Sequence, residues 1–169
     1  MVELEGTYAH RPDRIPRAMS SVLPLAIRPA TPTDAAGIAS LSGELGYPVA
    51  VETLADRLDR VLARVGDVVL VAEAGGDVVG WIHGSEQEFL ESGSRCELLG
   101  LVVDARQRGQ GVGRRLVAAV EAWAARRGLE LVSVRSNVAR AESHPFYERL
   151  GYARVKTQHA YRKRLDLRQ

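Results

Sequence analysis

Residues 106–113 read Arg-Gln-Arg-Gly-Gln-Gly-Val-Gly, and the glycine spacing of this stretch suits the binding of an anion. An apolar run at 98–103 precedes it, and an amphipathic segment begins at Arg114. A strand, a glycine turn and a helix start, in that order, present unpaired backbone N–H groups and a partial positive charge. Glycine lets this backbone come close to a phosphate because no Cβ intervenes. The stretch therefore predicts a phosphate-binding loop.

Two better-known glycine loops do not fit these residues. A P-loop ends in Lys followed by Ser or Thr, whereas Gly113 is followed by Arg114 and Arg115. The dinucleotide fingerprint has the spacing G-x-G-x-x-G, whereas Gly109, Gly111 and Gly113 are spaced G-x-G-x-G. The ligand is therefore expected to be neither a nucleoside triphosphate held by a P-loop nor a dinucleotide.

The arrangement resembles the GNAT superfamily of acetyl-coenzyme A-dependent N-acetyltransferases. Its central motif, [Q/R]-x-x-G-x-[G/A], is matched by Arg108, Gly111 and Gly113. The strand at 97–104 looks like the fourth strand of the family. Asn137 and the run Phe-Tyr-Glu-Arg-Leu-Gly-Tyr at 146–152 look like its fifth strand, last helix and sixth strand. The resemblance covers roughly residues 25–165 and is strongest over 96–152.

The resemblance implies a fold and a cosubstrate. The fold is a mixed α/β domain, with a central sheet of six to seven strands, a splayed fourth and fifth strand, and about four flanking helices. The cosubstrate is acetyl-coenzyme A. The positions implied to bind it are Leu101, Val102, Val103, Arg108, Gly109, Gln110, Gly111, Val112, Gly113, Arg114, Asn137 and Tyr147.

The same resemblance suggests catalytic roles. Tyr147 stands where many family members keep a tyrosine near the thioester sulfur, and its phenol could protonate the leaving thiolate. Glu97 is the first choice for the general base that deprotonates the amine, and His83 is the reserve. A backbone N–H near Val102 would stabilise the oxyanion. Plainer roles stay open: packing for Tyr147, amine orientation for Glu97, a structural histidine at 83 and a turn at Asn137.

The sequence indicates less about the residues that bind the acceptor than about those that bind the coenzyme. The candidate substrate residues are His83, Glu86 and His144. Glu86, Glu88 and Glu91 could form the acidic pocket that an aminoglycoside needs, although such a cluster is usually a solvated loop. The expected reaction is direct attack by a primary amine of a small molecule or peptide in a ternary complex. The alternatives are a protein lysine or N-terminal amine, an aminoglycoside, and a sensor that binds acetyl-coenzyme A without turnover.

Composition limits the other classes. The chain has 169 residues, 46% of them apolar, and a net charge of +2, which gives no argument for nucleic acid or an anionic membrane. No apolar run approaches about 18 residues and no signal-peptide pattern is present, so a cytoplasmic protein is expected. Cys96, the single cysteine, is expected to be a small buried hydrophobe. The histidines lack metal-ligand spacing, so no metal is expected. A homodimer is common in the superfamily and remains open.

Hydrophobic periodicity indicates the elements that must position these residues. Residues 1–22 are expected to form a flexible arm and 23–169 a single domain. Strands are expected at 23–28, 68–72, 78–83, 96–103, 129–135, 152–155 and 158–164. Helices are expected at 31–46, 54–65, 114–128 and 143–150, with a polar connection at 84–95.

Overall fold

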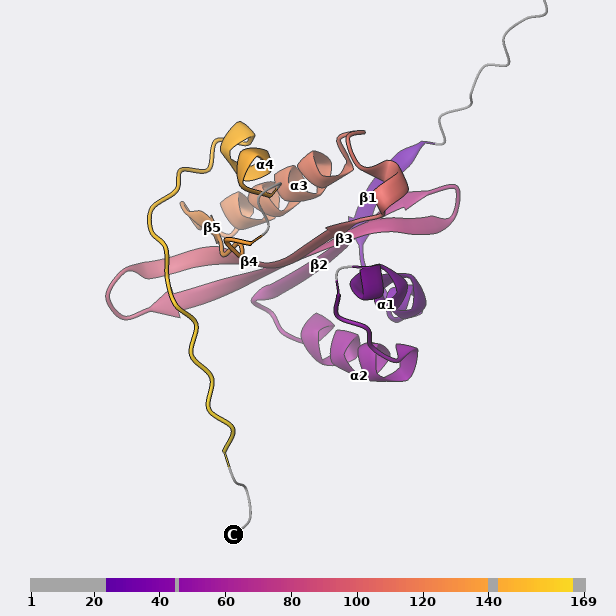
Figure 1. The fold of residues 1–169 in the computed structure, drawn as a ribbon, viewed down its shortest axis with the longest axis horizontal. Helices are drawn as coiled ribbons and strands as arrows, with labels where there is room; N and C mark the ends of the chain where they lie inside the picture. The colour runs from indigo at the N-terminus through magenta and orange to yellow at the C-terminus, as the bar shows by residue number, and fades with distance from the viewer. Residues whose placement is uncertain (1–23, 45, 140–142, 166–169) are drawn as a thin grey trace, which may run out of the picture.

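The fold is a five-stranded sheet with helices on both faces, seen in a computed structural model that describes residues 24–44, 46–139 and 143–165 (Figure 1). The expected arm at 1–22 lies outside these residues. The strands lie in chain order as β1 (Leu25–Pro29), β2 (Asp67–Ala74), β3 (Asp77–Phe89), β4 (Gly93–Val103) and β5 (Val132–Val134). The helices are α1 (Ala35–Glu44), α2 (Val51–Leu62), α3 (Val112–Arg126) and α4 (Ser143–Arg149), with 3-10 turns at Pro32–Asp34 and Ala105–Gln107.

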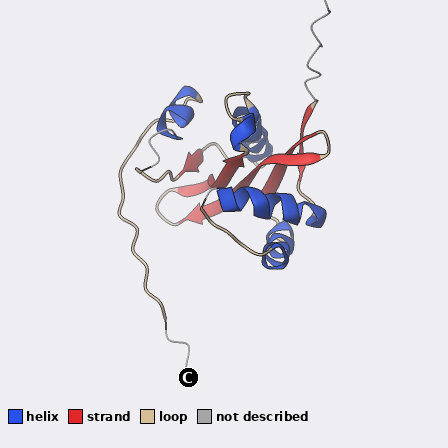
Figure 2. Ribbon diagram, turned by 45° about the vertical axis from the view of Figure 1, so that its right-hand side comes forward, coloured by secondary structure: helices blue, strands red, loops and turns tan. Residues whose placement is uncertain are grey.

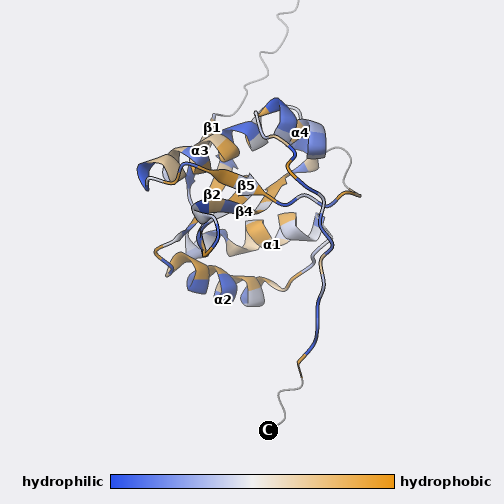
Figure 3. Ribbon diagram, turned by 90° about the vertical axis from the view of Figure 1, so that its left-hand side faces the viewer, coloured by the Kyte–Doolittle hydropathy of each residue, from blue (hydrophilic) through white to orange (hydrophobic). Residues whose placement is uncertain are grey.

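Two apolar cores hold the helices to the sheet. On one face, Leu116 and Val120 of α3 are buried against Ile82 of β3. On the other face, Ile38 of α1 and Leu58 of α2 pack with strand side chains that include Trp81. The two layers lie on opposite sides of the sheet in Figure 1, and Figure 3 shows that the outer side of α2 is hydrophilic. The helical spacing of the apolar residues explains this arrangement, since it gives each helix one apolar stripe.

A β-bulge in β4 changes which face its side chains occupy. His83 pairs with Gly100 and Gly84 pairs with Leu98, so Leu99 has no cross-strand partner. A bulge inserts one residue and re-aims those that follow. Gly100 thereby faces α1 and α2, where a Cβ at this position would stand 2.7 Å from the Trp81 ring. Only glycine therefore fits under the indole without displacing it.

Pairing between β4 and β5 is parallel and short. It joins residues 96–98 to 132–134, the last pair being Leu98 with Val134. β4 continues to Val103. Among the described strands, none pairs with residues 99–103 on the β5 side, which leaves a backbone edge beside the bulge. β4 and β5 therefore splay apart, as the resemblance to the GNAT superfamily implied for the fourth and fifth strands.

The polar connection expected at 84–95 was wrong. These residues complete β3 and begin β4, and the hairpin turns between Phe89 and Gly93. The outer hairpin extends past the helices, so its ladder of backbone hydrogen bonds needs no apolar alternation. Periodicity alone therefore could not distinguish it from a loop.

The strands expected at 152–155 and 158–164 were also wrong. From Tyr152 onward the described chain has no helix or strand, and it extends away from the domain (Figures 1 and 2). The alternating side chains remain exposed, Val155 at 86% and Tyr161 at 90%. A strand needs a partner, and β5 offers an edge of only three residues. The sheet among the described residues therefore has five strands instead of six or seven.

Candidate functional site

The glycine loop forms an open turn at the start of α3. Gly109 and Gly111 have φ angles of 77° and 82°, in the left-handed region that glycine adopts without strain. A Cβ at either position would meet no atom within 4 Å, so the glycines serve the backbone path and not packing. The first helical hydrogen bond runs from Arg115 N to Gly111 O, at 3.0 Å. The backbone N–H groups ahead of it are the unpaired donors of a helix start, which suits an anion.

Gly113 has a different role from the other two glycines. A Cβ there would stand 3.2 Å from the Phe146 ring and 3.6 Å from Val103. Its absence lets α4 approach the start of α3, and the Phe146 ring stacks edge-on against Tyr147 at 5.0 Å. The loop and Tyr147 are therefore joined through one close contact.

The polar side chains of the loop hold its shape. Asp104 caps the turn after β4 by accepting a 2.8 Å hydrogen bond from Arg106 N, and the Arg106 guanidinium bonds the same carboxylate. These hydrogen bonds lower the pKa of Asp104 to about 2. Arg108 donates to the Val103 carbonyl at 3.3 Å, and Gln110 donates to the Arg106 carbonyl at 3.1 Å.

The two arginines at the start of α3 differ. Arg114 is exposed in the first turn of the helix. The Arg115 guanidinium donates to the Leu25 carbonyl at 2.7 Å. Arg115 therefore ties α3 to β1, whereas Arg114 is free to face a bound anion.

Glu97 is buried in the short paired part of β4 and β5, opposite Ser133, with 4% of its surface exposed. Its Oε1 accepts hydrogen bonds from Ser133 Oγ at 2.6 Å and Arg95 Nε at 3.0 Å, and Arg135 Nε lies 3.5 Å from Oε2. Burial alone would raise the pKa of Glu97, but the Ser133 hydrogen bond and the two arginines lower it below its usual range. Glu97 is therefore a carboxylate anion at neutral pH.

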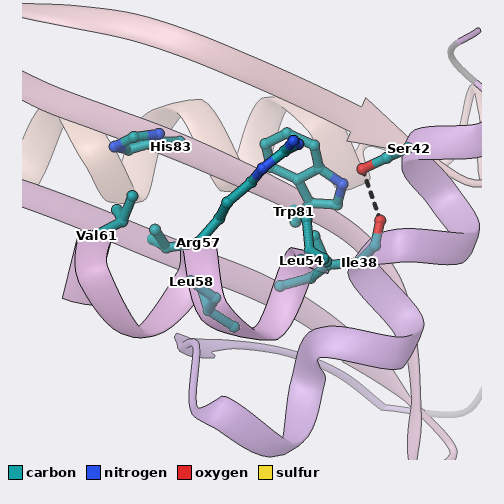
Figure 4. A pocket seen from close by; sticks show the side chains of 9 residues that line it. Ile38, Ser42, Leu54, Arg57, Leu58, Val61, Trp81 and His83 are labelled. Atoms are coloured by element: carbon teal, nitrogen blue, oxygen red, sulfur yellow. Dashed lines mark hydrogen bonds between the residues drawn. The ribbon is translucent and has the colours of Figure 1, made fainter. Parts of the chain in front are cut away.

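A cavity of about 180 Å³ lies between the sheet and the pair α1 and α2. Aliphatic side chains of α1, α2 and β2 form most of its lining. Its polar lining residues are Ser42, Arg57, Trp81 and His83 (Figure 4).

His83 is a neutral acceptor or donor in this cavity. Its Nε2 is buried and has no hydrogen-bond partner among the described residues; the nearest acid, Asp67 Oδ1, is 3.6 Å away. Burial lowers the pKa of His83 below its usual value, although Asp67 opposes the shift. A His ring in this state can take a proton from a neighbouring amine.

The other expected site residues lie elsewhere. Glu86 is ion-paired with Arg127, the residue that follows α3, at 2.5 Å, on the opposite face of the sheet from the cavity. Asn137 Oδ1 accepts from Ala139 N at 3.0 Å, as a turn residue does, and its carbonyl lies 3.2 Å from His144 Nε2. The structure therefore does not bring Glu86 or His144 to the cavity.

Cys96 is fully buried and burial raises the pKa of its thiol to about 11, as expected of a structural hydrophobe. In the described ranges no group of three or more His, Cys, Asp or Glu side chains could hold a metal ion. No helix of those ranges is long and apolar enough to cross a membrane.

Sequence reasoning named Glu97 and His83 but missed the residues beside them, Ser133 at Glu97 and Arg57 and Trp81 in the cavity. Trp81 and His83 are two residues apart on one strand, so the strand period places them on one face, and this signal was available. Ser133 and Arg57 gave no such signal, because their positions depend on the pairing of β4 with β5 and on the docking of α2.

A family model for the acetyltransferase (GNAT) family matches residues 39–152. The aminoglycoside N(6')-acetyltransferase type 1 of Stenotrophomonas maltophilia is 31% identical over 130 residues, which are 75% of this chain and 84% of that protein. An aminoalkylphosphonate N-acetyltransferase of Salmonella typhimurium is 38% identical over 78 residues, 46% of this chain and 51% of that protein.

Solved structures with the same fold include the aminoglycoside N-acetyltransferase AAC(6')-Iy in complex with CoA. Its TM-score is 0.77 at 21% identity, over 90% of this chain and 100% of that chain. The glucosamine-6-phosphate N-acetyltransferase of Arabidopsis thaliana has a TM-score of 0.72 at 21% identity, over 82% of this chain and 98% of that chain. At these identities the structures show a common fold.

Proposed function

Because the chain belongs to the acetyltransferase (GNAT) family, we propose that it transfers the acetyl group of acetyl-coenzyme A to a primary amine of a small molecule. The observation that carries this proposal is the open glycine turn at the start of α3, directly after the β4 edge that runs on beyond β5. The two curated relatives are named for small amine acceptors, aminoglycosides and aminoalkylphosphonates, which supports an acceptor of that size. We expect the protein to work in the cytoplasm and without a metal.

The coenzyme half of the site fits the residues present. Backbone N–H groups of Val112, Gly113 and Arg114 would hold the pyrophosphate, and the Arg108 guanidinium would add charge at the rim. The edge at 101–103, which no described strand pairs on the β5 side, would hydrogen-bond the pantetheine arm as an added strand does. When bound, acetyl-coenzyme A supplies the activated acetyl group, and the β4 edge orients it.

Tyr147 is proposed as the general acid. Its ring is held edge-on between Phe146 at 5.0 Å and Tyr152 at 5.7 Å, which fixes the direction of the phenol. We assign the protonation of the leaving thiolate to the Tyr147 phenol, because Tyr147 stands where many members of the family keep a tyrosine near the thioester sulfur.

Two groups are candidates for the general base, and both face the α1 and α2 side of the sheet. Glu97 stays ionised, so it would act through a water or hold the substrate ammonium in place. His83 is neutral at its buried position, because burial lowers its pKa below the usual value, so it can accept a proton directly. We keep Glu97 as the first candidate and His83 as the second, and a pH profile separates them as described below.

The test of the proposal is amine-dependent release of coenzyme A from acetyl-coenzyme A across a panel of small amines, a lysine peptide and an aminoglycoside. The proposal expects release that requires one of the small amines, with one acetylated product per thiol released. Binding of acetyl-coenzyme A without release for any acceptor would favour a sensor. Release with the lysine peptide alone would assign a protein acceptor.

We also propose a homodimer, supported by the extended segment 152–165. The segment extends away from the domain (Figure 2), and its Val155 and Tyr161 side chains are exposed six residues apart, a spacing that puts both on one side of an extended chain. A second copy would cover them. Sedimentation of the full chain should show a dimer that Tyr161→Glu converts to a monomer and that Gln158→Glu, which adds the same charge at the opposite parity, leaves intact. A wild-type chain that stays monomeric at high concentration contradicts the dimer.

A further inference from the structure

The polar groups that line the cavity offer hydrogen-bond donors. The Trp81 indole N–H is buried and has no acceptor among the described residues. Indole nitrogen can only donate, and a buried donor without an acceptor is costly. Ser42 Oγ already donates to the Ile38 carbonyl at 2.7 Å. The cavity therefore lacks an acceptor for Trp81 and is completed by a ligand that brings one.

The charged side chain that lines the cavity also favours an anionic ligand. Arg57 reaches from α2 toward β3, the strand that carries Trp81 and His83 (Figure 4). Within the described ranges no hydrogen bond or ion pair engages Arg57. No acidic side chain of those ranges lines the cavity. Its one formal charge is thus a guanidinium, whose donors match carboxylate and phosphonate oxygens.

Two carboxylates on this side of the sheet are paired with arginines: Glu97 with Arg95 and Arg135, and Asp67 with Arg64 at 3.5 Å. A polycation that entered the cavity would meet the Arg57 guanidinium and no acidic side chain among the described lining residues. Such a surface repels an acceptor with several ammonium groups and attracts one with an acid group.

The cavity and Glu97 lie on one face, at a separation that fits a short molecule. Strand alternation puts Trp81, His83 and Ser85 on the same face of β3, and Ser85 pairs with Glu97. Two residues along a strand span about 7 Å, so His83 lies about 7 Å from Trp81 and the same distance from Ser85. One small molecule can therefore place an acid group at Arg57 and Trp81 and its amine beside His83, on the side toward Glu97.

We infer that the acceptor is a small amine that carries its own acid group, a carboxylate or a phosphonate, which Arg57 and the Trp81 indole N–H bind in this cavity. This inference rests on the proposed acetyl transfer for its amine and on the cavity for its acid group. It separates this chain from acetyltransferases whose acceptors are polycationic aminoglycosides.

The first experiment compares acceptors that differ in charge. Wild-type protein should release coenzyme A with 3-aminopropylphosphonate at a kcat/KM at least about tenfold above that with propylamine or kanamycin, as expected for a charged hydrogen bond. Arg57→Gln should remove that preference, chiefly by raising KM. Arg60→Gln, on the same helix but outside the cavity lining, should keep it. A preference for kanamycin, or an equal loss for all three amines in Arg57→Gln, overturns the inference.

The second experiment needs no turnover. Propylphosphonate has the acid group and no amine, and in a Trp123→Phe background Trp81 is the only indole left to report its binding. We expect a saturable change in Trp81 fluorescence, weakened at least about tenfold by Arg57→Gln and unchanged by Arg60→Gln. If it appears while no amine is acetylated, the proposed function fails and the anion site stands. If amines are acetylated but propylphosphonate leaves the fluorescence unchanged, the anion site fails and the proposed function stands.

Discussion

At the scale of single residues, the catalytic and packing roles of Tyr147 can be distinguished by removing its hydroxyl group alone. Tyr147→Phe keeps the ring that stacks on Phe146 and Tyr152 and removes only the hydroxyl. If the phenol protonates the thiolate, kcat should fall about 100-fold while the dissociation constant of coenzyme A changes little. Steady-state kinetics and calorimetric titration measure the two quantities.

Tyr161→Phe supplies the matched control, because Tyr161 is exposed in the segment after α4. It should leave both quantities unchanged. A Tyr147→Phe protein with wild-type kcat would leave Tyr147 with packing alone.

The general base is identified by where the acid limb of kcat/KM lies. His83 works as a base only when neutral, and burial holds its folded pKa below 6.5, so a His83-dependent limb would lie below pH 6.5. The pKa of Glu97 lies below its usual value of 4.5, so Glu97 stays ionised above about pH 5 and would give no limb there. Comparing pH profiles of His83→Gln and Glu97→Gln decides between them. If Glu97 acts, only Glu97→Gln loses rate uniformly from pH 5 to pH 8.

At the scale of elements, the entry into α1 depends on one buried carboxylate. Asp34 accepts two 2.8 Å hydrogen bonds from Arg28 and one of 2.7 Å from Thr31 N. These hydrogen bonds lower the pKa of Asp34 from 3.8 to about 2, and those from Arg28 have the largest effect. Burial of the carboxylate opposes the shift. Asp34→Asn should therefore reduce the free energy of unfolding at pH 7 by about 2 kcal/mol.

The pH dependence of that loss has a definite sign. Because the folded pKa lies below the unfolded one, the stabilisation is complete above about pH 4 and disappears as the pH falls toward about 2. Urea denaturation at several pH values should show the difference between wild type and Asp34→Asn closing over that interval. Asp59→Asn, on the exposed side of α2, should change little at any pH.

The packing of Trp81 on the bulge of β4 can be tested at Gly100. Gly100→Ala would place a Cβ 2.7 Å from the Trp81 ring, so it should destabilise the fold by about 1–3 kcal/mol and disturb the cavity that Trp81 lines. Gly43→Ala, in α1 with no atom within 4 Å of the added Cβ, should be neutral or slightly stabilising. Equal effects of the two substitutions would contradict the close packing of Trp81 on β4.

The sequence predicted those elements whose signals are local. The cap at Thr31, the stripe of Leu116 and Val120, and the glycine turn each depend on residues within one helix or turn. The bulge at Leu99 and the hydrogen bond between Ser133 and Glu97 depend on how distant strands pair, and no periodicity records that. The tail after Gly151 has the alternation of a strand, but pairing requires an edge that the described β5 does not provide.

At the scale of the whole molecule, the sheet divides the site into two sides. The glycine turn and Tyr147 belong to the α3 and α4 layer, whereas Arg57, Trp81 and His83 belong to the α1 and α2 side (Figures 1 and 4). The β4 edge beyond Leu98 lies between them. This division suits direct transfer, because donor and acceptor can approach the same backbone edge from opposite faces.

We propose that the coenzyme side and the cavity side of the sheet act together to acetylate a small amine. The most direct measurement follows thiol release from acetyl-coenzyme A with 3-aminopropylphosphonate, together with mass spectrometry of the amine, in wild-type and Tyr147→Phe protein. We predict one N-acetylated amine per thiol in the wild type, and a rate about 100-fold lower in Tyr147→Phe. Acetyl-coenzyme A that binds but is never consumed, with this amine or any other small amine, would contradict it.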